Sequence, residues 1–282
     1  MKTTMLALLL VLSGLTAAET VTRRALIIGL GKQEDTSWGK IHGDNDVYYV
    51  RQMLLQMGYT DIRTLVNEQA TKAAVVRAFS DMADYCKSGD IVYIHYSGHG
   101  QLMTDLDGDE ELKHERGSHR KWDEAWIPYD AYMVYGPKDR GEKHLSDDEV
   151  ARLLTAIRER IGCRGELTVV VDACHSGDAT CGPEDEPVRG VDTKFSIPQK
   201  GNTAPAQPVE EQWRTISACK PYQLCTEMKG QQVGKLTFAL YQMGSGAFNH
   251  SNRELERKLT DFMERHRGRL PQHPMVEGKK KH

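Results

Sequence analysis

The sequence has little net charge and few cysteines. Its 37 lysines and arginines nearly balance 40 aspartates and glutamates, so the formal charge of the 282 residues is −3. Nucleic-acid-binding proteins present strongly basic surfaces to phosphate, and this balance therefore argues against such a partner. Six cysteines are too few for a disulfide scaffold at this length, and their spacing does not show which of them could pair. The composition is that of an ordinary globular domain.

The apolar run at the N-terminus is too short to cross a membrane. It covers 5–12, follows Lys2 and leads into small residues that end at Ala18. This order is typical of a secretory signal peptide, and no other span is expected. We therefore expect 1–18 to be removed, the protein to be secreted or periplasmic, and 19–282 to form one domain.

Apolar runs alternate with helical periods along the first half of the chain. The pattern predicts three strands separated by two amphipathic helices, with the strands at 24–29, 61–66 and 91–96 and the helices at 44–57 and 71–86. This order with short links predicts a parallel sheet covered on both faces by helices.

The central strand of that sheet is expected at 167–171. The run is apolar and β-branched, which suits a strand buried on both faces of a parallel sheet. A helix should precede it, because Ser146 and Glu149 form a capping box before a helical period that reaches Ile161.

Two stretches show no periodicity. The charged segment 101–145 is expected to be irregular, and 179–211, rich in proline, glycine and polar residues, is expected to be an exposed linker within the domain. A strand at 215–219 and helices at 236–243 and 254–265 should follow. We find no internal repeat.

Two strand ends carry candidate catalytic residues. Cys174 follows the strand at 167–171, and His99 follows the strand at 91–96. Neighbouring parallel strands lie about 5 Å apart, and ligands bind beyond their carboxyl ends. A cysteine hydrolase needs a thiolate, a nearby imidazole and amide donors for the developing oxyanion. The two residues together therefore indicate nucleophilic catalysis.

The motifs Tyr-Ser-Gly-His-Gly at 96–100 and Asp-Ala-Cys-His-Ser-Gly at 172–177 closely resemble those of metacaspases, cysteine peptidases of the caspase-like clan. Further similar segments lie at 42–46, 107–110, 122–124, 127–130, 217–219 and 234–240. The resemblance implies an α/β fold, a caspase-like three-layer sandwich with a six-stranded, mostly parallel sheet flanked by helices on both faces. It also implies that Cys174 is the nucleophile and His99 the general acid/base, with the amides of Gly100 and Cys174 as the oxyanion hole.

The same resemblance places Asp46, Ser97 and Asp172 in the pocket for the substrate residue before the scissile bond. Two carboxylates in one partly desolvated pocket repel each other and need a cation between them. A guanidinium can satisfy both with its forked donors, whereas an ammonium is a point charge. We therefore expect an endopeptidase that cleaves peptides or proteins after Arg or Lys.

Alternatives to this function remain open at this point. One is a clan relative that cleaves after Asn or Asp, and the other is a caspase-like fold that binds or scaffolds without turnover. Because family members often process themselves, we also expect self-cleavage in the linker, at Arg189, Lys194 or Lys200. The alternative is that the linker is a plain surface loop that is not cleaved.

A metal site is also implied by the resemblance. Calcium-dependent metacaspases bind the ion through acidic residues that match Asp123, Asp147 and Asp148, and hard oxygen ligands suit calcium. The alternative is that Asp147 and Asp148 only complement a helix N-terminus. An EF-hand is rejected because Glu110 stands where that loop needs glycine. Cys174 with His175 follows no standard zinc spacing. We expect modest activation by calcium, no organic cofactor, and a monomer.

Overall fold

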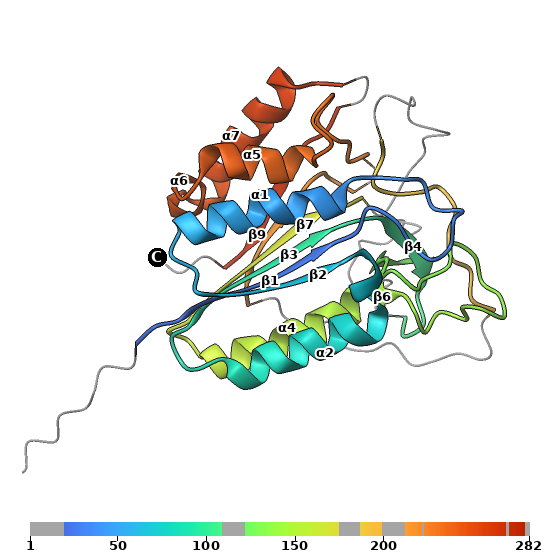
Figure 1. The fold of residues 1–282 in the computed structure, drawn as a ribbon, viewed down its shortest axis with the longest axis horizontal. Helices are drawn as coiled ribbons and strands as arrows, with labels where there is room; N and C mark the ends of the chain where they lie inside the picture. The colour runs from blue at the N-terminus through green and yellow to red at the C-terminus, as the bar shows by residue number, and fades with distance from the viewer. Residues whose placement is uncertain are drawn as a thin grey trace, which may run out of the picture.

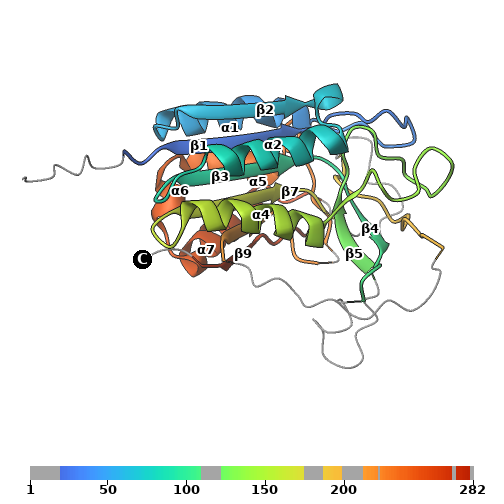
Figure 2. The same ribbon diagram turned by 90° about the horizontal axis from the view of Figure 1, so that it is seen from below.

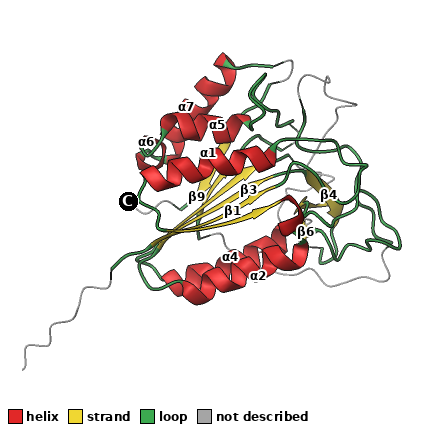
Figure 3. Ribbon diagram, viewed as in Figure 1, coloured by secondary structure: helices red, strands yellow, loops and turns green. Residues whose placement is uncertain are grey.

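A six-stranded sheet lies at the centre of the structure (Figures 1 and 3). The computed structural model describes residues 20–108, 122–174, 187–198, 212–221, 223–268 and 271–279, so the expected signal peptide lies outside it. In spatial order the strands are β2 (Asp61–Val66), β1 (Arg23–Gly29), β3 (Ile91–Ser97), β7 (Glu166–Asp172), β8 (Arg214–Ser217) and β9 (Met275–Gly278). All neighbouring strands are parallel except β8 and β9. The expected six-stranded, mostly parallel sheet is confirmed.

Helices cover both faces of this sheet (Figure 1). On one face lie α1 (Gly43–Gln56), α5 (Lys235–Met243), α6 (Gly246–Asn249) and α7 (Asn252–Arg265), and on the other lie α2 (Lys72–Tyr85) and α4 (Asp147–Ile161). The expected cap of α4 is present, since Ser146 Oγ accepts a hydrogen bond from the Glu149 amide. Within the described ranges, no helix is both long and apolar enough to span a membrane.

The central strand β7 is buried on both faces, as its apolar run predicts. Val170 packs into the apolar cluster that includes residues of α1 and α5, whereas Val169 and Val171 pack into the cluster that includes residues of α2 and α4. Successive side chains of a strand point to opposite faces of a sheet. A strand between two helical layers therefore needs apolar residues without interruption.

A second, smaller sheet occupies the stretch expected to be irregular. β4 (Gly100–Thr104), β5 (Trp122–Trp126) and β6 (Leu145–Ser146) pair antiparallel near the carboxyl end of the main sheet (Figure 2). The expectation for 101–145 is wrong at these strands. Their short, partly acidic sequences lack the apolar run of a central strand, because they are not enclosed between two helical layers. The sequence pattern also missed β9, which pairs with β8.

The expected exposed linker is partly built into the fold. Within 187–198, Arg189 and Phe195 are fully buried. Phe195 donates its amide hydrogen to Leu102 and accepts one from Thr104, so this segment runs beside β4. The prediction of exposure is wrong at these two residues, because each enters a pocket made by residues distant in the sequence.

Candidate active site

The ends of β3 and β7 bring the two predicted motifs together. Ser97 pairs with Asp172 in the register of these parallel strands, so His99 and Cys174 each lie two residues beyond the same pair. The first turn of α1 approaches closely: a Cβ atom on Gly43 would lie 2.6 Å from the Leu30 carbonyl oxygen. Glycine at this position therefore lets α1 begin against the sheet edge.

Asp46, Ser97 and Asp172, the three residues expected in the substrate pocket, are completely buried side by side. Ser97 Oγ donates a hydrogen bond to Asp46 Oδ2. The start of α5 holds both carboxylates, since the Gly234 amide donates to Asp46 (3.0 Å) and the Thr237 amide donates to Asp172 (2.8 Å). The pocket is thus assembled from the ends of two strands, β3 and β7, and the starts of two helices, α1 and α5, and it contains two buried carboxylates.

The side chain of Arg189 fills this pocket. Its Nη1 lies 2.6 Å from Asp46 Oδ2, 2.8 Å from Ser97 Oγ and 3.6 Å from Asp172 Oδ1. Burial would lower the pKa of Arg189, but the charges of Asp46, Asp172 and Glu227 outweigh burial and hold it well above its usual value. The guanidinium is therefore the cation that two neighbouring carboxylates require.

Glu227 is a further pocket residue that the sequence analysis did not identify. Its Oε1 accepts hydrogen bonds from Nε (3.3 Å) and Nη2 (3.1 Å) of Arg189. His42 holds the same carboxylate, with its amide 2.7 Å from Oε1 and its Nδ1 2.6 Å from Oε2. The available signal was a lone charged residue between Leu224 and Met228, both buried. A lone charged residue among buried neighbours does not reveal which pocket its side chain enters.

The backbone of Arg189 lies against the two amides expected to form the oxyanion hole. Its carbonyl oxygen accepts hydrogen bonds from the Cys174 amide (3.0 Å) and the Gly100 amide (3.2 Å), and its own amide donates to the Cys225 carbonyl (3.0 Å). The next residue, Gly190, lies against Cys174, the expected nucleophile: a Cβ atom there would lie 2.6 Å from Cys174 Sγ. The peptide bond between Arg189 and Gly190 is therefore held beside the thiol.

His99 is buried, and the contact of one ring nitrogen shows which of the two nitrogens carries the hydrogen. Nε2 lies 2.7 Å from the Gly39 carbonyl oxygen, which can only accept, so Nε2 carries the hydrogen. The ring packs against Trp38 with centroids 5.1 Å apart and the ring planes tilted by 31°. Burial lowers the pKa of His99 to about 4, so the ring is neutral at physiological pH. Nδ1 is buried and has no hydrogen-bond partner within the described ranges, which leaves it as the basic nitrogen.

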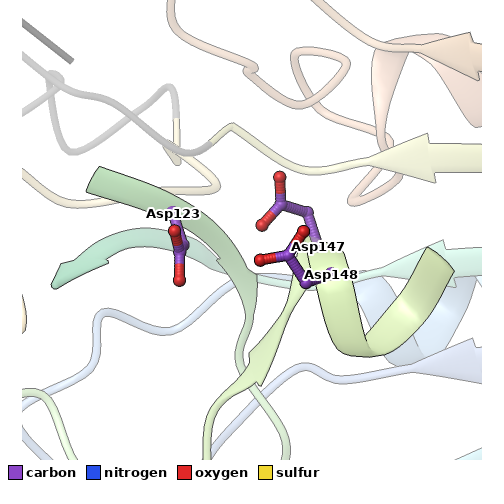
Figure 4. Close-up of side chains that lie close together, drawn as sticks. All are labelled: Asp123, Asp147 and Asp148. Carbon is purple, nitrogen blue, oxygen red and sulfur yellow. The ribbon is translucent and has the colours of Figure 1, made fainter. Parts of the chain in front are cut away.

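The acidic residues expected to bind a metal also lie close together in the structure. Asp123 on β5 faces Asp147 and Asp148 at the start of α4, and one oxygen of each lies within 4.8 Å of the others (Figure 4). Burial and the charges of neighbouring acids, Asp147 first, raise the pKa of Asp123 to about 9. Asp123 Oδ1 is buried without a hydrogen-bond partner in the described part of the chain. Three carboxylates that supply hard oxygen donors, with the buried Asp123 among them, fit a calcium ion.

A family model described as a metacaspase, peptidase C14 domain, matches residues 23–181, more than half of the chain. The chain belongs to the metacaspase family. The matched region contains His99, Cys174 and the three pocket residues expected from the sequence. Arg189 and Glu227 lie beyond it, so their place in the site of this metacaspase is known from the structure.

Curated metacaspases align with part of this family member. It is 34% identical over 173 residues to Metacaspase-1A of Aspergillus oryzae, an alignment that covers 58% of this chain and 36% of the relative. Metacaspase-1 of Ajellomyces capsulatus is 32% identical over 171 residues, covering 57% of this chain and 42% of the relative. The chain thus spans well under half the length of these relatives.

Solved structures share the fold. A crystal structure of a Geobacter sulfurreducens protein superposes with a TM-score of 0.60 at 20% identity, covering 92% of this chain and 95% of that one. Caspase-1 from Spodoptera frugiperda superposes with a TM-score of 0.57 at 11% identity, covering 92% and 86%. The caspase-like fold expected from the resemblance is confirmed.

Proposed function

We propose that this metacaspase is a cysteine endopeptidase that hydrolyses peptide bonds after Arg or Lys. One observation carries the proposal: Arg189 has its side chain between Asp46 and Asp172 and its carbonyl on the Cys174 and Gly100 amides. The substrate residue before a scissile bond must place its side chain in the specificity pocket and its carbonyl oxygen in the oxyanion hole. An Asp side chain there would add an anion to buried carboxylates, which disfavours the alternative specificity for Asp.

The chemistry assigned to the site uses two side chains. His99 Nδ1 takes the proton of the Cys174 thiol, and the thiolate attacks the substrate carbonyl carbon. The amides of Gly100 and Cys174 bind the oxygen as it becomes negative. The protonated His99 then gives its proton to the leaving amine, which departs and leaves a thioester on Cys174. A water molecule, deprotonated by His99, hydrolyses this thioester and frees the thiol.

The proposal extends to self-cleavage after Arg189. The segment that carries Arg189 is part of the same chain, and it fills the pocket that another substrate would need. Among the three expected sites, Lys194 is exposed with its Nζ over the Trp122 ring, and Lys200 lies outside the described residues. Arg189 is therefore the site that the geometry supports, and until it is cut the segment competes with other substrates.

Calcium is proposed to bind at Asp123, Asp147 and Asp148, where it would neutralise their charges. β5, which carries Asp123, pairs along its length with β4, and β4 begins at Gly100. Fixing β5 would therefore steady the strand that supplies one of the two oxyanion amides. No step of the reaction itself requires the ion.

The test is a panel of short peptides that differ in the residue before the cut: Arg, Lys, Asn or Asp. We expect turnover of Arg and Lys peptides and none of the others. Asp172→Ala should lose this turnover, while Cys174 should still react with iodoacetamide. Cleavage after Asp or Asn would contradict the specificity. Absence of any turnover, with or without calcium, would favour a binding or scaffolding role.

Secretion, which depends on residues 1–18, is proposed separately. Expression of the full chain in a bacterial host and N-terminal sequencing of the periplasmic protein would test it. We expect the mature chain to begin after Ala18, and an uncleaved cytoplasmic product would contradict the proposal.

A further inference from the structure

The guanidinium of Arg189 is bound along two different edges. Nη1 contacts Asp46 and Ser97 at the bottom of the pocket, whereas Nε and Nη2 share the Oε1 atom of Glu227. Because two nitrogens of the guanidinium donate to the same oxygen, this contact depends on the planar shape of the guanidinium as well as on its positive charge. Glu227 therefore recognises the pair of donors Nε and Nη2 of arginine, whereas Asp46 and Asp172 contact only Nη1.

Glu227 is held in place without the guanidinium. Its side chain is 2% exposed, and the amide and Nδ1 of His42 bind its two oxygens. His42 directly precedes α1, and Asp46 in the first turn of α1 binds the other edge of the guanidinium. The start of α1 therefore positions both Asp46 and, through His42, Glu227. The acceptor cannot easily turn away from the pocket when a different side chain enters.

We propose that Glu227 makes this pocket select arginine over lysine, an inference that rests on the proposed peptidase function. Counted in bonds from Cα, the Cε methylene of lysine stands where arginine has Nε, and its ammonium stands where arginine has Cζ. A lysine would bring one point charge toward Asp46 and Asp172 and place a methylene against Glu227 Oε1. A buried carboxylate oxygen that loses its donors raises the free energy of the complex.

The test compares kcat/KM for matched Arg and Lys peptides in wild type and Glu227→Gln. Loss of charge-assisted hydrogen bonds should lower the Arg value about 10- to 100-fold and the Lys value less than about threefold. The Arg-to-Lys ratio should therefore collapse. Asp46→Asn should lower both values, and Glu277→Gln, an exposed position on β9, should change neither.

Two outcomes separate this inference from the proposed function. If basic peptides are cut but Glu227→Gln lowers both equally, Glu227 does not discriminate and the inference fails alone. If wild type cuts no basic peptide, the proposed function fails with it. Thermal unfolding of each variant and its rate of alkylation at Cys174 identify any loss caused by misfolding.

Two further thiols lie near the proposed nucleophile Cys174, those of Cys219 and Cys225. Cys225 Sγ lies 2.7 Å from Cys219 Sγ and 3.1 Å from the Ala173 carbonyl oxygen, and its thiol also interacts with that of Cys174. All three cysteines are buried, and the structure holds them as thiols. Cys225 thus has two neighbours with which it could form a disulfide.

We propose that Cys219 and Cys225 form a disulfide on oxidation and thereby protect Cys174. In the reaction, the two thiols reduce one external disulfide, such as glutathione disulfide: a Cys219–Cys225 bond forms, the external S–S bond breaks, and two glutathione thiols leave with the two protons. The bond occupies Cys225, so this thiol can no longer form a disulfide with Cys174. The bridged segment also carries the Cys225 carbonyl that binds the Arg189 amide.

The test exposes wild type and Cys219→Ser to glutathione disulfide. Wild type should lose two hydrogens in its intact mass, show a Cys219–Cys225 linked peptide, and keep its activity. In Cys219→Ser, Cys225 should pair with Cys174, with loss of most activity and recovery on adding dithiothreitol. Cys86→Ser, in the other apolar cluster, should behave like wild type.

Equal loss of activity in wild type and Cys219→Ser, or an oxidised wild type without the linked peptide, would overturn this proposal. Linked-peptide mapping does not depend on turnover, so the disulfide is tested even if the peptidase proposal fails.

Discussion

The carbonyl oxygen of Arg189 accepts a hydrogen bond from the amide of Cys174 at 3.0 Å. The same residue has its side chain completely buried among Asp46, Asp172 and Glu227. Backbone and side chain of one residue therefore occupy two subsites at once. This relationship places a segment of the chain where the proposed reaction would occur.

Replacing Cys174, the proposed nucleophile, should abolish peptide cleavage and leave the fold intact. Cys174→Ala has no sulfur to attack a carbonyl, and the change removes one buried atom from a site that α1 and the sheet support. His99→Ala should reduce turnover nearly as much, because the leaving amine then has no acid. Activity would be measured on an Arg peptide and folding by circular dichroism. Turnover by Cys174→Ala protein shown to be free of other proteases would contradict the assignment.

Incubation of the active protein should yield two fragments cut between Arg189 and Gly190. Mass spectrometry of the products would locate the cut. Arg189→Gln should remain uncut there, because a neutral side chain leaves Asp46 and Asp172 without their cation. Lys194→Ala, a matched change on the same segment, should be processed like wild type. Fragments that end at Lys194 or Lys200, or an intact band after long incubation, would count against cleavage after Arg189.

Calcium should raise peptidase activity modestly through the acidic cluster. Neutralising two ligands in Asp147→Asn/Asp148→Asn should remove the activation while the basal rate without calcium stays similar, since the pocket lies elsewhere. Calorimetry of calcium binding gives a second readout. If wild-type activity is unchanged in excess chelator and no calcium binding is measured, the proposed calcium site is wrong.

Stability should fall between pH 6.5 and pH 4. Burial lowers the pKa of His95, and of His99, from 6.5 to about 4. In this window the unfolded chain binds protons that the folded protein excludes, so the free energy of unfolding decreases as the pH falls. The loss at pH 5 is about 2 kcal/mol for each histidine by linkage. Urea unfolding at pH 7 and pH 5 would measure it.

His95→Gln supplies the control for this pH dependence. Gln can replace the contacts of His95 with the Tyr93 and Thr237 hydroxyls but cannot titrate. The variant should therefore lose less stability on acidification than wild type. An equal loss in both proteins would show that other groups cause the pH dependence.

Local sequence was enough to predict the central architecture and its catalytic edge. The uninterrupted apolar run of β7 indicated a strand between two helical layers, and the position of His99 and Cys174 after two strands placed both at one edge. These features depend on neighbouring residues and on the general rule that parallel strands share their carboxyl ends. The capping residue Ser146 similarly marked the start of α4.

Tertiary structure alone decided which distant residues complete the site. Arg189 reads as one of several basic residues in a polar segment, and Glu227 reads as a lone acid among buried neighbours. Their meeting depends on the path of chain segments on either side of β8, which no local pattern encodes. The contact between the thiols of Cys219 and Cys225 has the same origin. Local propensity determines where elements begin, whereas long-range packing determines which side chains share a buried pocket.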